Sequence, residues 1–320
     1  MSGQESLAGS AAGVPADLVV QAPDLSAEAI EAFRQRFAPA PLQRQAASVR
    51  LIGVGPRASV AASVADLAAH WHCDANLVPP RWALADFRLL AVDMDSTLVQ
   101  IESLDELAAL AGLGSEVAAI TEAAMRGQVT DYSESLRQRV ALLAGTDASL
   151  LQTVAQQRLR LSPGAERLIG AARRAGLRTL LATGGFGFFA RILQRRLGID
   201  VVCANELDLR DGRLTGVVQG AEPNPERLVD AQGKAAALQR ACDDIGCTAR
   251  QAIAFGDGAN DVPMLALAGV GVAYHAKPKV QESTQYRLNY CGLDGVLEWF
   301  SDAPPVTTAK LSRPVPFEES

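Results

Sequence analysis

Three acidic residues follow an apolar run in the segment LLAVDMDSTLVQIE, which spans residues 89–102. Asp93 and Asp95 come directly after the run, and Glu102 stands at the end of the segment. Clustered carboxylates can bind a divalent cation, and a carboxylate can attack an electrophilic centre. An Asp-x-Asp pair after a strand is, by itself, more typical of a solvated turn or a helix cap. The choice between a turn and a reaction centre therefore depends on the other motifs.

Two further apolar runs end in polar residues. LLATGGF contains Thr183, Gly184 and Gly185, while IAFGDGANDVPML contains Asp257, Asn260 and Asp261; Lys234 begins the helical pattern between them. Each motif alone has an ordinary structural explanation. A calcium loop is excluded for GDGANDV, because Ala259 stands where such a loop requires an oxygen ligand. The order of the motifs along the chain instead favours one shared site.

Together these residue types suit phosphoryl transfer. Asp93, Asp95 and Asp257 offer the hard oxygen ligands that Mg²⁺ takes in proteins. A cation there would offset charge repulsion, so that a carboxylate could attack phosphorus and form an aspartyl-phosphate. The groups expected to bind the equatorial phosphoryl oxygens are Lys234, the Thr183 hydroxyl and the free N–H groups of Gly184 and Gly185.

The elements that position these residues follow an alternating pattern. Strand-like runs at FRLLAV, LRTLLAT, DVVCA, QAIAF and VGVAY have helical patterns between several of them, which predicts a parallel sheet covered by helices. RDGRLTG contains an Asp-Gly turn and predicts a hairpin. Ligands of such sheets bind at the carboxyl ends of the strands. We therefore expect an α/β fold with a Rossmann-like parallel sheet, a helical cap insertion and a small N-terminal α+β domain.

The expected domain boundaries follow from composition. Residues 1–16 are small and polar and predict a disordered tail. Residues 17–80 predict the α+β unit, and NLVPP marks its end because consecutive prolines disfavour helix and central strand. Residues 81–300 predict the catalytic domain, with the cap at about 103–161, and residues 301–320 predict a flexible tail.

Composition restricts the classes of partner. The chain has 320 residues, is 48% hydrophobic and carries a formal net charge of −6, which argues against a nucleic-acid-binding surface. We expect no membrane span and no secretory signal, because no apolar run is long enough. Five scattered cysteines do not form a disulfide framework, so a reducing cytoplasm is the expected compartment. A homodimer is one option for the oligomeric state.

The four motifs resemble those of the haloacid dehalogenase-like hydrolases. DMDST, TGGF, the isolated Lys234 and GDGANDVPML stand in the order of that superfamily. DMDSTLVQIESLDELA, AAMRGQVTDYSESLRQRVALL and LSPGAERLI further resemble the core and cap of its phosphoserine phosphatase family, over roughly residues 84–298. The resemblance implies hydrolysis of phosphoserine as the last step of serine synthesis. Thr183 departs from the family pattern, which usually has Ser, but a hydroxyl is retained.

The resemblance also implies roles for the chemical residues. Asp93 would be the nucleophile, and Asp95 would be the general acid and then the general base. Mg²⁺ would bind the Asp93 carboxylate, the Asp95 backbone carbonyl and Asp257, with Asp261 orienting the site from just outside. Thr183, Gly184 and Lys234 would bind the phosphoryl group, and Asn260 would support the substrate loop together with Gly258.

The cap residues are implied to select the substrate. Glu102 would bind the substrate ammonium and Arg139 its carboxylate, while Met125 and Tyr132 would form an apolar wall against water. A solvated helix face is the alternative explanation for Arg139, since SLRQRV also offers Arg137, but the family spacing favours Arg139. Three alternatives stay open: a phosphatase for another small phosphomonoester, a phosphotransferase to an alcohol, and a non-catalytic amino-acid sensor.

Overall fold

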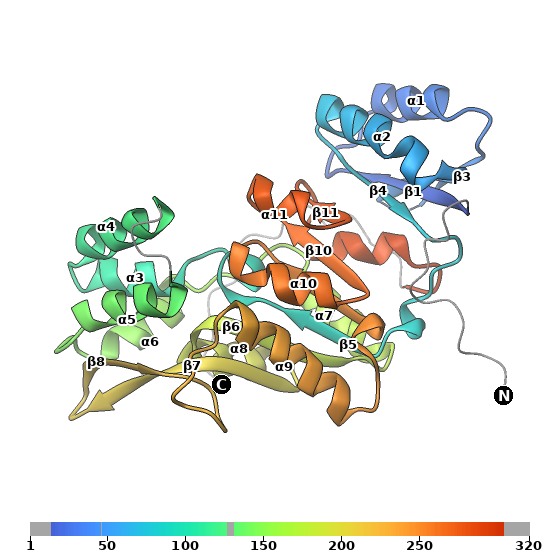
Figure 1. Cartoon of the computed structure of the whole chain (residues 1–320). Helices are drawn as coiled ribbons and strands as arrows, with labels where there is room; N and C mark the ends of the chain where they lie inside the picture. The colour runs from blue at the N-terminus through green and yellow to red at the C-terminus, as the bar shows by residue number, and fades with distance from the viewer. Residues whose placement is uncertain (1–13, 46, 127–130, 304–320) are drawn as a thin grey trace.

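A seven-stranded sheet forms the centre of the molecule (Figure 1). The computed structural model describes residues 14–45, 47–126 and 131–303. The strand order is β11-β10-β9-β5-β6-β7-β8, and neighbours are parallel except β7 and β8, which form an antiparallel hairpin. The strand bounds are β5 (Leu89–Val92), β6 (Arg178–Phe186), β7 (Val201–Arg210), β8 (Arg213–Gln219), β9 (Ala252–Gly256), β10 (Val270–Tyr274) and β11 (Tyr286–Leu288).

Helices cover both faces of this sheet. Side chains alternate along each strand, so Leu90 and Val92 of β5 belong to one buried cluster, while Leu89 and Ala91 belong to another. Helices α7 and α8 pack in the first cluster, and α9 and α10 pack in the second. The helix bounds are α7 (Ala165–Arg174), α8 (Gly187–Leu197), α9 (Ala231–Asp244), α10 (Val262–Leu267) and α11 (Pro278–Glu282).

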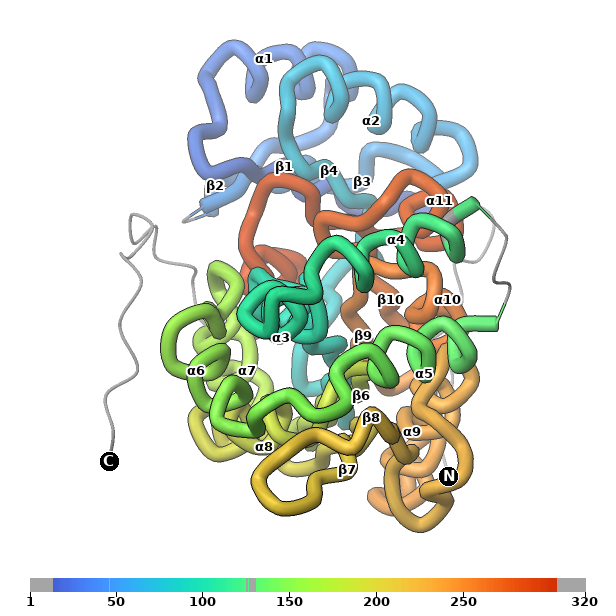
Figure 2. The backbone as a smooth tube through the Cα atoms, turned by 90° about the vertical axis from the view of Figure 1, so that its left-hand side faces the viewer, coloured from blue at the N-terminus to red at the C-terminus, as the bar shows by residue number. Residues whose placement is uncertain are grey.

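Four helices between β5 and α7 form a separate cap, at the left of Figure 1. They are α3 (Ser103–Leu110), α4 (Gly114–Met125), α5 (Tyr132–Leu142) and α6 (Ser149–Gln157). Helix α5 packs on β8, and α6 contacts α8. Figure 2 shows α4 and α5 side by side in front of the central strands. The cap is therefore fixed to the core on its hairpin side.

The N-terminal unit is a four-stranded antiparallel sheet in the order β2-β3-β1-β4. Its elements are β1 (Pro15–Gln21), α1 (Ala27–Arg36), β2 (Leu42–Arg44), β3 (Ser48–Pro56), α2 (Arg57–Trp71) and β4 (Asp74–Val78). Helices α1 and α2 pack on one face of the sheet. The other face carries buried polar groups, such as the ion pair of Arg50 with Asp17 at 3.1 Å, and the same guanidinium donates to the Trp299 carbonyl.

The N-terminal unit also hydrogen-bonds along the edge strand β11. The Asn76 amide donates to the Arg287 carbonyl at 2.9 Å and accepts from the Arg287 N–H at 3.1 Å. The carboxylate of Asp74 accepts three backbone N–H groups of residues 289–291. These bonds satisfy main-chain groups that an edge strand would otherwise leave unpaired.

The α/β fold class expected from the sequence is confirmed, with its N-terminal antiparallel unit. The hairpin expected at RDGRLTG is confirmed by the pairing of β7 with β8. Three local details differ: β1 begins at Pro15, NLVPP starts inside β4, and Asp302 accepts N–H groups of residues 84 and 85. The remaining tail expectations, on residues 1–13 and 304–320, lie outside the described residues.

Within the described part of the chain, no helix has both the length and the apolar character that a membrane crossing requires.

Candidate active site

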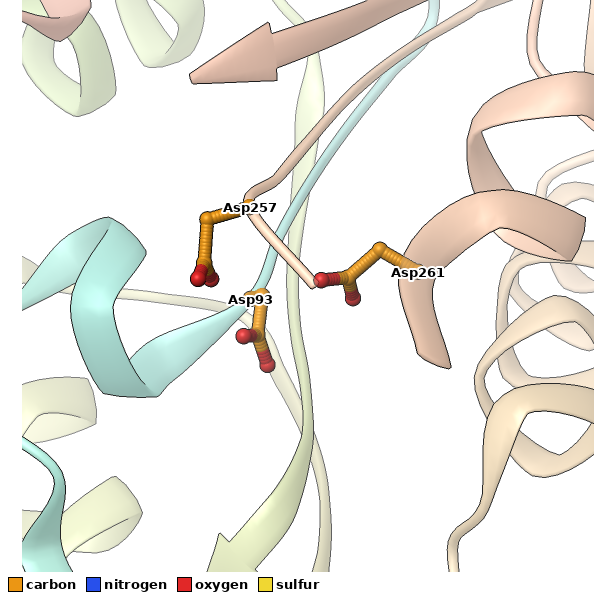
Figure 3. Close-up of side chains that lie close together, drawn as sticks. All are labelled: Asp93, Asp257 and Asp261. Carbon is orange, nitrogen blue, oxygen red and sulfur yellow. The ribbon is translucent and has the colours of Figure 1, made fainter. Parts of the chain in front are cut away.

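The carboxyl ends of adjacent strands bring the predicted acids together. Because β5 lies between β6 and β9, Asp93 and Asp257 follow neighbouring strands and meet at one edge of the sheet. Asp261 comes from the short turn before α10. Figure 3 shows these three side chains close together, and one carboxylate oxygen from each lies within 4.8 Å of the others. The structure thus contains the acidic cluster that the motifs predict.

Lys234 is a fully buried cation at this cluster. Its Nζ donates to Asp93 Oδ1 at 2.6 Å and to Asp261 Oδ1 at 2.7 Å. Asp230 caps the start of α9 by accepting the Gly233 N–H at 2.7 Å, which fixes the helical turn that carries Lys234. A buried ammonium needs such partners, because an unpaired charge away from water is very costly. Lys234 therefore orients both carboxylates.

Asp95 lies in a strained turn after β5. Ser96, the next residue, has φ of 56°, in the left-handed region that residues other than glycine rarely adopt. The backbone N–H and hydroxyl of Ser103 donate to the two oxygens of Asp95, at 3.1 and 3.0 Å. Ser96 also donates to Glu102 at 2.6 Å. The first residues of the cap thus hold the carboxyl of Asp95 in one orientation.

Burial raises the pKa values of Asp93, Asp95 and Asp257. The pKa of Asp95 rises to about 7, through burial and then the charge of Glu102. The pKa of Asp257 rises to about 6, through burial and then the charge of Asp261, and that of Asp93 rises well above its ordinary value for the same two reasons. Burial alone would lower the pKa of Lys234, but Asp261 and Asp93 together raise it above its ordinary value. The lysine therefore stays charged.

The TGGF segment forms a break in the sheet. The pairing of β6 with β7 stops at Ala182 and resumes at Phe186, which leaves the residues between them out of the ladder. Thr183 is buried, and its Oγ accepts the Gly185 N–H at 2.8 Å. The expectation that the Gly185 N–H is free for a phosphate is therefore wrong. The hydroxyl proton of Thr183 can still be donated, because a hydroxyl both donates and accepts.

Among the predicted cap residues, Tyr132 lies at this edge of the sheet. A Cβ on Gly184 would stand 2.1 Å from the Tyr132 hydroxyl oxygen, so α5 approaches the TGGF segment directly. Burial raises the pKa of that hydroxyl to about 12. The charges of Lys234 and Arg139 lower this pKa, while those of Asp93 and Asp95 raise it.

The structure gives less direct evidence on the other predicted substrate-binding residues. Arg139 lies on α5 and donates through Nε to the Ser135 carbonyl at 3.3 Å. Glu102 is exposed, directly before α3, yet close enough to influence Asp95. Met125 ends α4, and its side chain lies outside the described residues. Asn260 lies in the turn before α10, where its Oδ1 would stand 2.4 Å from a Cβ on Gly258.

Three buried polar residues in this region were not anticipated from the sequence. Thr97 donates to Asp257 Oδ1 at 3.0 Å, and Ser103 holds Asp95 as described above. Asn205 donates through Nδ2 to the Gly184 carbonyl at 2.8 Å and accepts the Val229 N–H at 2.7 Å. A signal existed for Asn205, because it follows the apolar run DVVCA just as Asp93 follows LLAV.

The donor set fits a hard divalent cation. Three carboxylates surround one point, while the nearby cation, Lys234, contacts only one oxygen each of Asp93 and Asp261. Cys and His ligands are absent from the cluster, which disfavours metals that prefer softer ligands. The described residues therefore offer a metal site of oxygen ligands at the carboxyl edge of the sheet.

Comparison with known proteins agrees with this geometry. The profile of the haloacid dehalogenase-like hydrolases matches residues 90–266, which contain all four motifs. The chain belongs to this family. The resemblance inferred from the motifs is thus confirmed, and this haloacid dehalogenase-like chain is an enzyme of the hydrolase class.

Individual relatives match longer stretches of this chain than the profile does. The haloacid dehalogenase-like chain is 51% identical over 223 residues to a phosphoserine phosphatase of Polaromonas sp., covering 70% of this chain and 94% of the relative. It is 47% identical over 221 residues to one of Albidiferax ferrireducens, covering 69% and 92%. The solved structure of a probable phosphoserine phosphatase from Vibrio cholerae matches 94% of this chain and 89% of its own, with a TM-score of 0.74 and 31% identity.

Proposed function

We propose that this chain is a Mg²⁺-dependent phosphoserine phosphatase that hydrolyses O-phospho-L-serine to serine and phosphate. The observation that carries the proposal is the buried arrangement of Asp93, Lys234 and Asp261 beside an acid, Asp95, whose pKa is raised to about 7. Similarity to named phosphoserine phosphatases supports the choice of substrate. The reaction would be the last step of serine synthesis, and five free cysteines suit a reducing cytoplasm.

The first chemical step is assigned to Asp93. A carboxylate oxygen of Asp93 forms a bond to phosphorus while the bond from phosphorus to the serine oxygen breaks. Asp95 gives its proton to that departing oxygen, which therefore leaves as a neutral hydroxyl. Lys234 holds one oxygen of Asp93 and supplies positive charge beside the phosphoryl group, whose equatorial oxygens gain charge in the transition state.

The second step reverses the role of Asp95. Its carboxylate, now deprotonated, takes a proton from a water that attacks the phosphorus of the aspartyl-phosphate. The phosphorus–Asp93 bond breaks, and inorganic phosphate leaves. A pKa near neutrality suits a group that must first give and then accept a proton. The two bonds from Ser103 keep Asp95 in place through both steps.

The metal would be held by Asp93 and Asp257, with Asp261 and Thr97 fixing those carboxylates. When bound, Mg²⁺ supplies positive charge that offsets the repulsion between the acids and an anionic substrate. Thr97 contributes by donating to Asp257 Oδ1 at 3.0 Å. Asp261 contributes by accepting the Gly258 N–H at 3.0 Å, which closes the turn after Asp257.

Substrate selection is assigned to the cap. Glu102 would bind the ammonium group of the substrate, and Arg139 would bind its carboxylate. The charges of both residues influence groups inside the site. Glu102 raises the pKa of Asp95, and Arg139 lowers the pKa of the Tyr132 hydroxyl. A phosphate ester without the amino-acid groups would lose both contacts while keeping those to the phosphoryl group.

The deciding experiment is phosphate release from L-phosphoserine with Mg²⁺, beside other small phosphomonoesters and an EDTA control. We expect a strong preference for phosphoserine that chelation abolishes. Alcohol acceptors added to the same assay would reveal phosphotransfer as a phosphorylated product. Turnover of another ester with phosphoserine ignored would leave Asp93 and Asp95 in place and refute the assignments of Glu102 and Arg139.

The nucleophile is tested by Asp93→Asn, with Asp105→Asn on the exposed side of α3 as the matched control. Asp93→Asn is expected to abolish turnover while the protein stays folded, because the amide keeps the shape but cannot attack phosphorus. Asp105→Asn should retain wild-type turnover. Substantial phosphate release by the Asp93→Asn variant would overturn the nucleophile assignment.

A further inference from the structure

Asn205 is a buried amide whose two polar ends are both used by backbone groups. It lies on β7 and has no exposed surface. Its Nδ2 donates to the Gly184 carbonyl at 2.8 Å, and its Oδ1 accepts the Val229 N–H at 2.7 Å. The two segments are distant in sequence, so this side chain links parts of the molecule that no strand ladder joins.

Each of these two segments leads to a group assigned to the phosphoryl. Gly184 follows Thr183 in the stretch where the pairing of β6 with β7 is interrupted, so the ladder does not hold its carbonyl. Val229 precedes Asp230, the cap of α9, and the carbonyl of Asp230 accepts the Lys234 N–H at 2.9 Å. A displacement of Val229 would therefore move the first turn of α9 and, with it, the lysine.

The two segments are also packed closely enough for one side chain to set their separation. A Cβ on Gly184 would stand 3.3 Å from the Val229 carbonyl. The complementary pattern, with the amide N–H facing a carbonyl and the amide oxygen facing an N–H, fixes the orientation of the Asn205 side chain. Such a residue rigidly supports groups that contact the substrate.

We propose that Asn205 is a positioning residue, which sets the TGGF segment at the distance from Lys234 where both contact one phosphoryl group. This inference rests on the proposed function, because it assumes the phosphoryl-binding roles that the family resemblance implies for Thr183, Gly184 and Lys234. Asn205 itself is expected to contact neither substrate nor metal.

The test compares two isosteric substitutions of buried amides. Asn205→Asp keeps the acceptor for Val229 but places an oxygen against the Gly184 carbonyl. Asn76→Asp is the matched control, since Asn76 is also buried and also bonds a backbone N–H and carbonyl, at the N-terminal unit far from the acids. Both variants should lose thermal stability to a similar degree. A difference between their kinetics therefore reflects displacement of the phosphoryl-binding groups and not the loss of stability.

The readouts are kcat and KM on phosphoserine and on an aryl phosphate, together with inhibition by inorganic phosphate. Asn205→Asp is expected to lower kcat about 10–100-fold on both esters, because small misplacement of binding groups has effects of this size. Inhibition by inorganic phosphate should weaken in parallel, while the preference for phosphoserine over the aryl ester is retained. The kcat and phosphate inhibition of Asn76→Asp should stay within about twofold of wild type, since a change at this distant contact does not alter the phosphoryl-binding site.

A folded Asn205→Asp enzyme with kcat and phosphate inhibition within about twofold of wild type would overturn the proposal. If the Asp variant fails to fold, Asn205→Ser, which removes both bonds without adding charge, is measured in the same way, and full turnover by it overturns the proposal. Failure of the substrate assignment is seen separately, because it appears in the wild-type enzyme as turnover of the aryl ester without preference for phosphoserine.

Discussion

Removal of the buried cation Lys234 should destabilise the protein, and by an amount that depends on pH. Its Nζ lies 2.6 Å from Asp93 and 2.7 Å from Asp261, and the lysine side chain is only 1% exposed. Breaking a buried ion pair by deleting one partner costs about 3–5 kcal/mol, because the remaining charge is left uncompensated. Lys234→Met retains most of the apolar stem of the side chain. The loss in free energy of unfolding at about pH 7.5 is therefore assigned to the missing charge.

The expected loss corresponds to a fall in Tm of roughly 6–20 °C, at about 2–4 °C for each kcal/mol. The penalty should shrink at about pH 5.5. The pKa of Asp93 in the folded protein lies well above its ordinary value, so a falling pH protonates this carboxyl first in the folded state and removes the uncompensated charge. Thermal unfolding in EDTA at both pH values measures the difference.

Lys279→Met, at an exposed position on α11, is the control for the loss of one positive charge. Its Tm should stay close to that of the wild type at both pH values, because an exposed charge contributes little. A loss below about 1 kcal/mol for Lys234→Met, or an equal loss at both pH values, would refute the electrostatic account of this cluster.

Three further outcomes are expected. Arg139→Ala should lower kcat/KM for phosphoserine about 10–100-fold, from the loss of one charge-assisted hydrogen bond; an equal loss on an aryl phosphate would make Arg139 structural. The rise in Tm on adding Mg²⁺ should be larger at about pH 8 than at about pH 5.5. Burial first, and neighbouring acids second, raise the pKa of Asp95 to about 7 and of Asp257 to about 6. The metal-free protein therefore loses stability as the pH rises from the ordinary carboxyl pKa up to these values, and the cation restores it. A pH-independent rise would count against a carboxylate site. Gly184→Ala should lower kcat/KM, because its Cβ would stand 2.1 Å from the Tyr132 hydroxyl oxygen. The double variant with Tyr132→Phe should recover part of that loss, and no recovery would place the cause elsewhere.

The residues with chemical roles could be predicted because a parallel sheet converts order in sequence into proximity in space. Asp93 and Asp257 each follow an apolar strand, and those strands are neighbours. Their convergence therefore needed only the strand ends and the rule for ligand position. The resemblance to a known family supplied the chemical role of each residue, which periodicity alone could not provide.

Contacts between side chains and distant backbone could not be predicted in this way. The two bonds of Asn205 join it to Gly184 and Val229, and no periodic signal specifies such a pair. The Thr183 hydroxyl took the Gly185 N–H that was expected to be free, because a short side chain competes locally for backbone donors. Strand β4 carries no alternating pattern toward solvent, since its polar residues bond to the core.

The contact of β4 with β11 has a consequence for how the chain tolerates being shortened. The Polaromonas relative is matched over 94% of its length by only 70% of this chain, so the catalytic fold exists in nature with little else attached. In this protein, however, Asn76 bonds Arg287 of the edge strand β11, and Asp74 bonds the residues directly after it. Deleting their unit would leave β11 as an open template for strand pairing between molecules, which is a common route to aggregation. The N-terminal unit thus has a protective value for the catalytic half, whether or not it binds a ligand of its own.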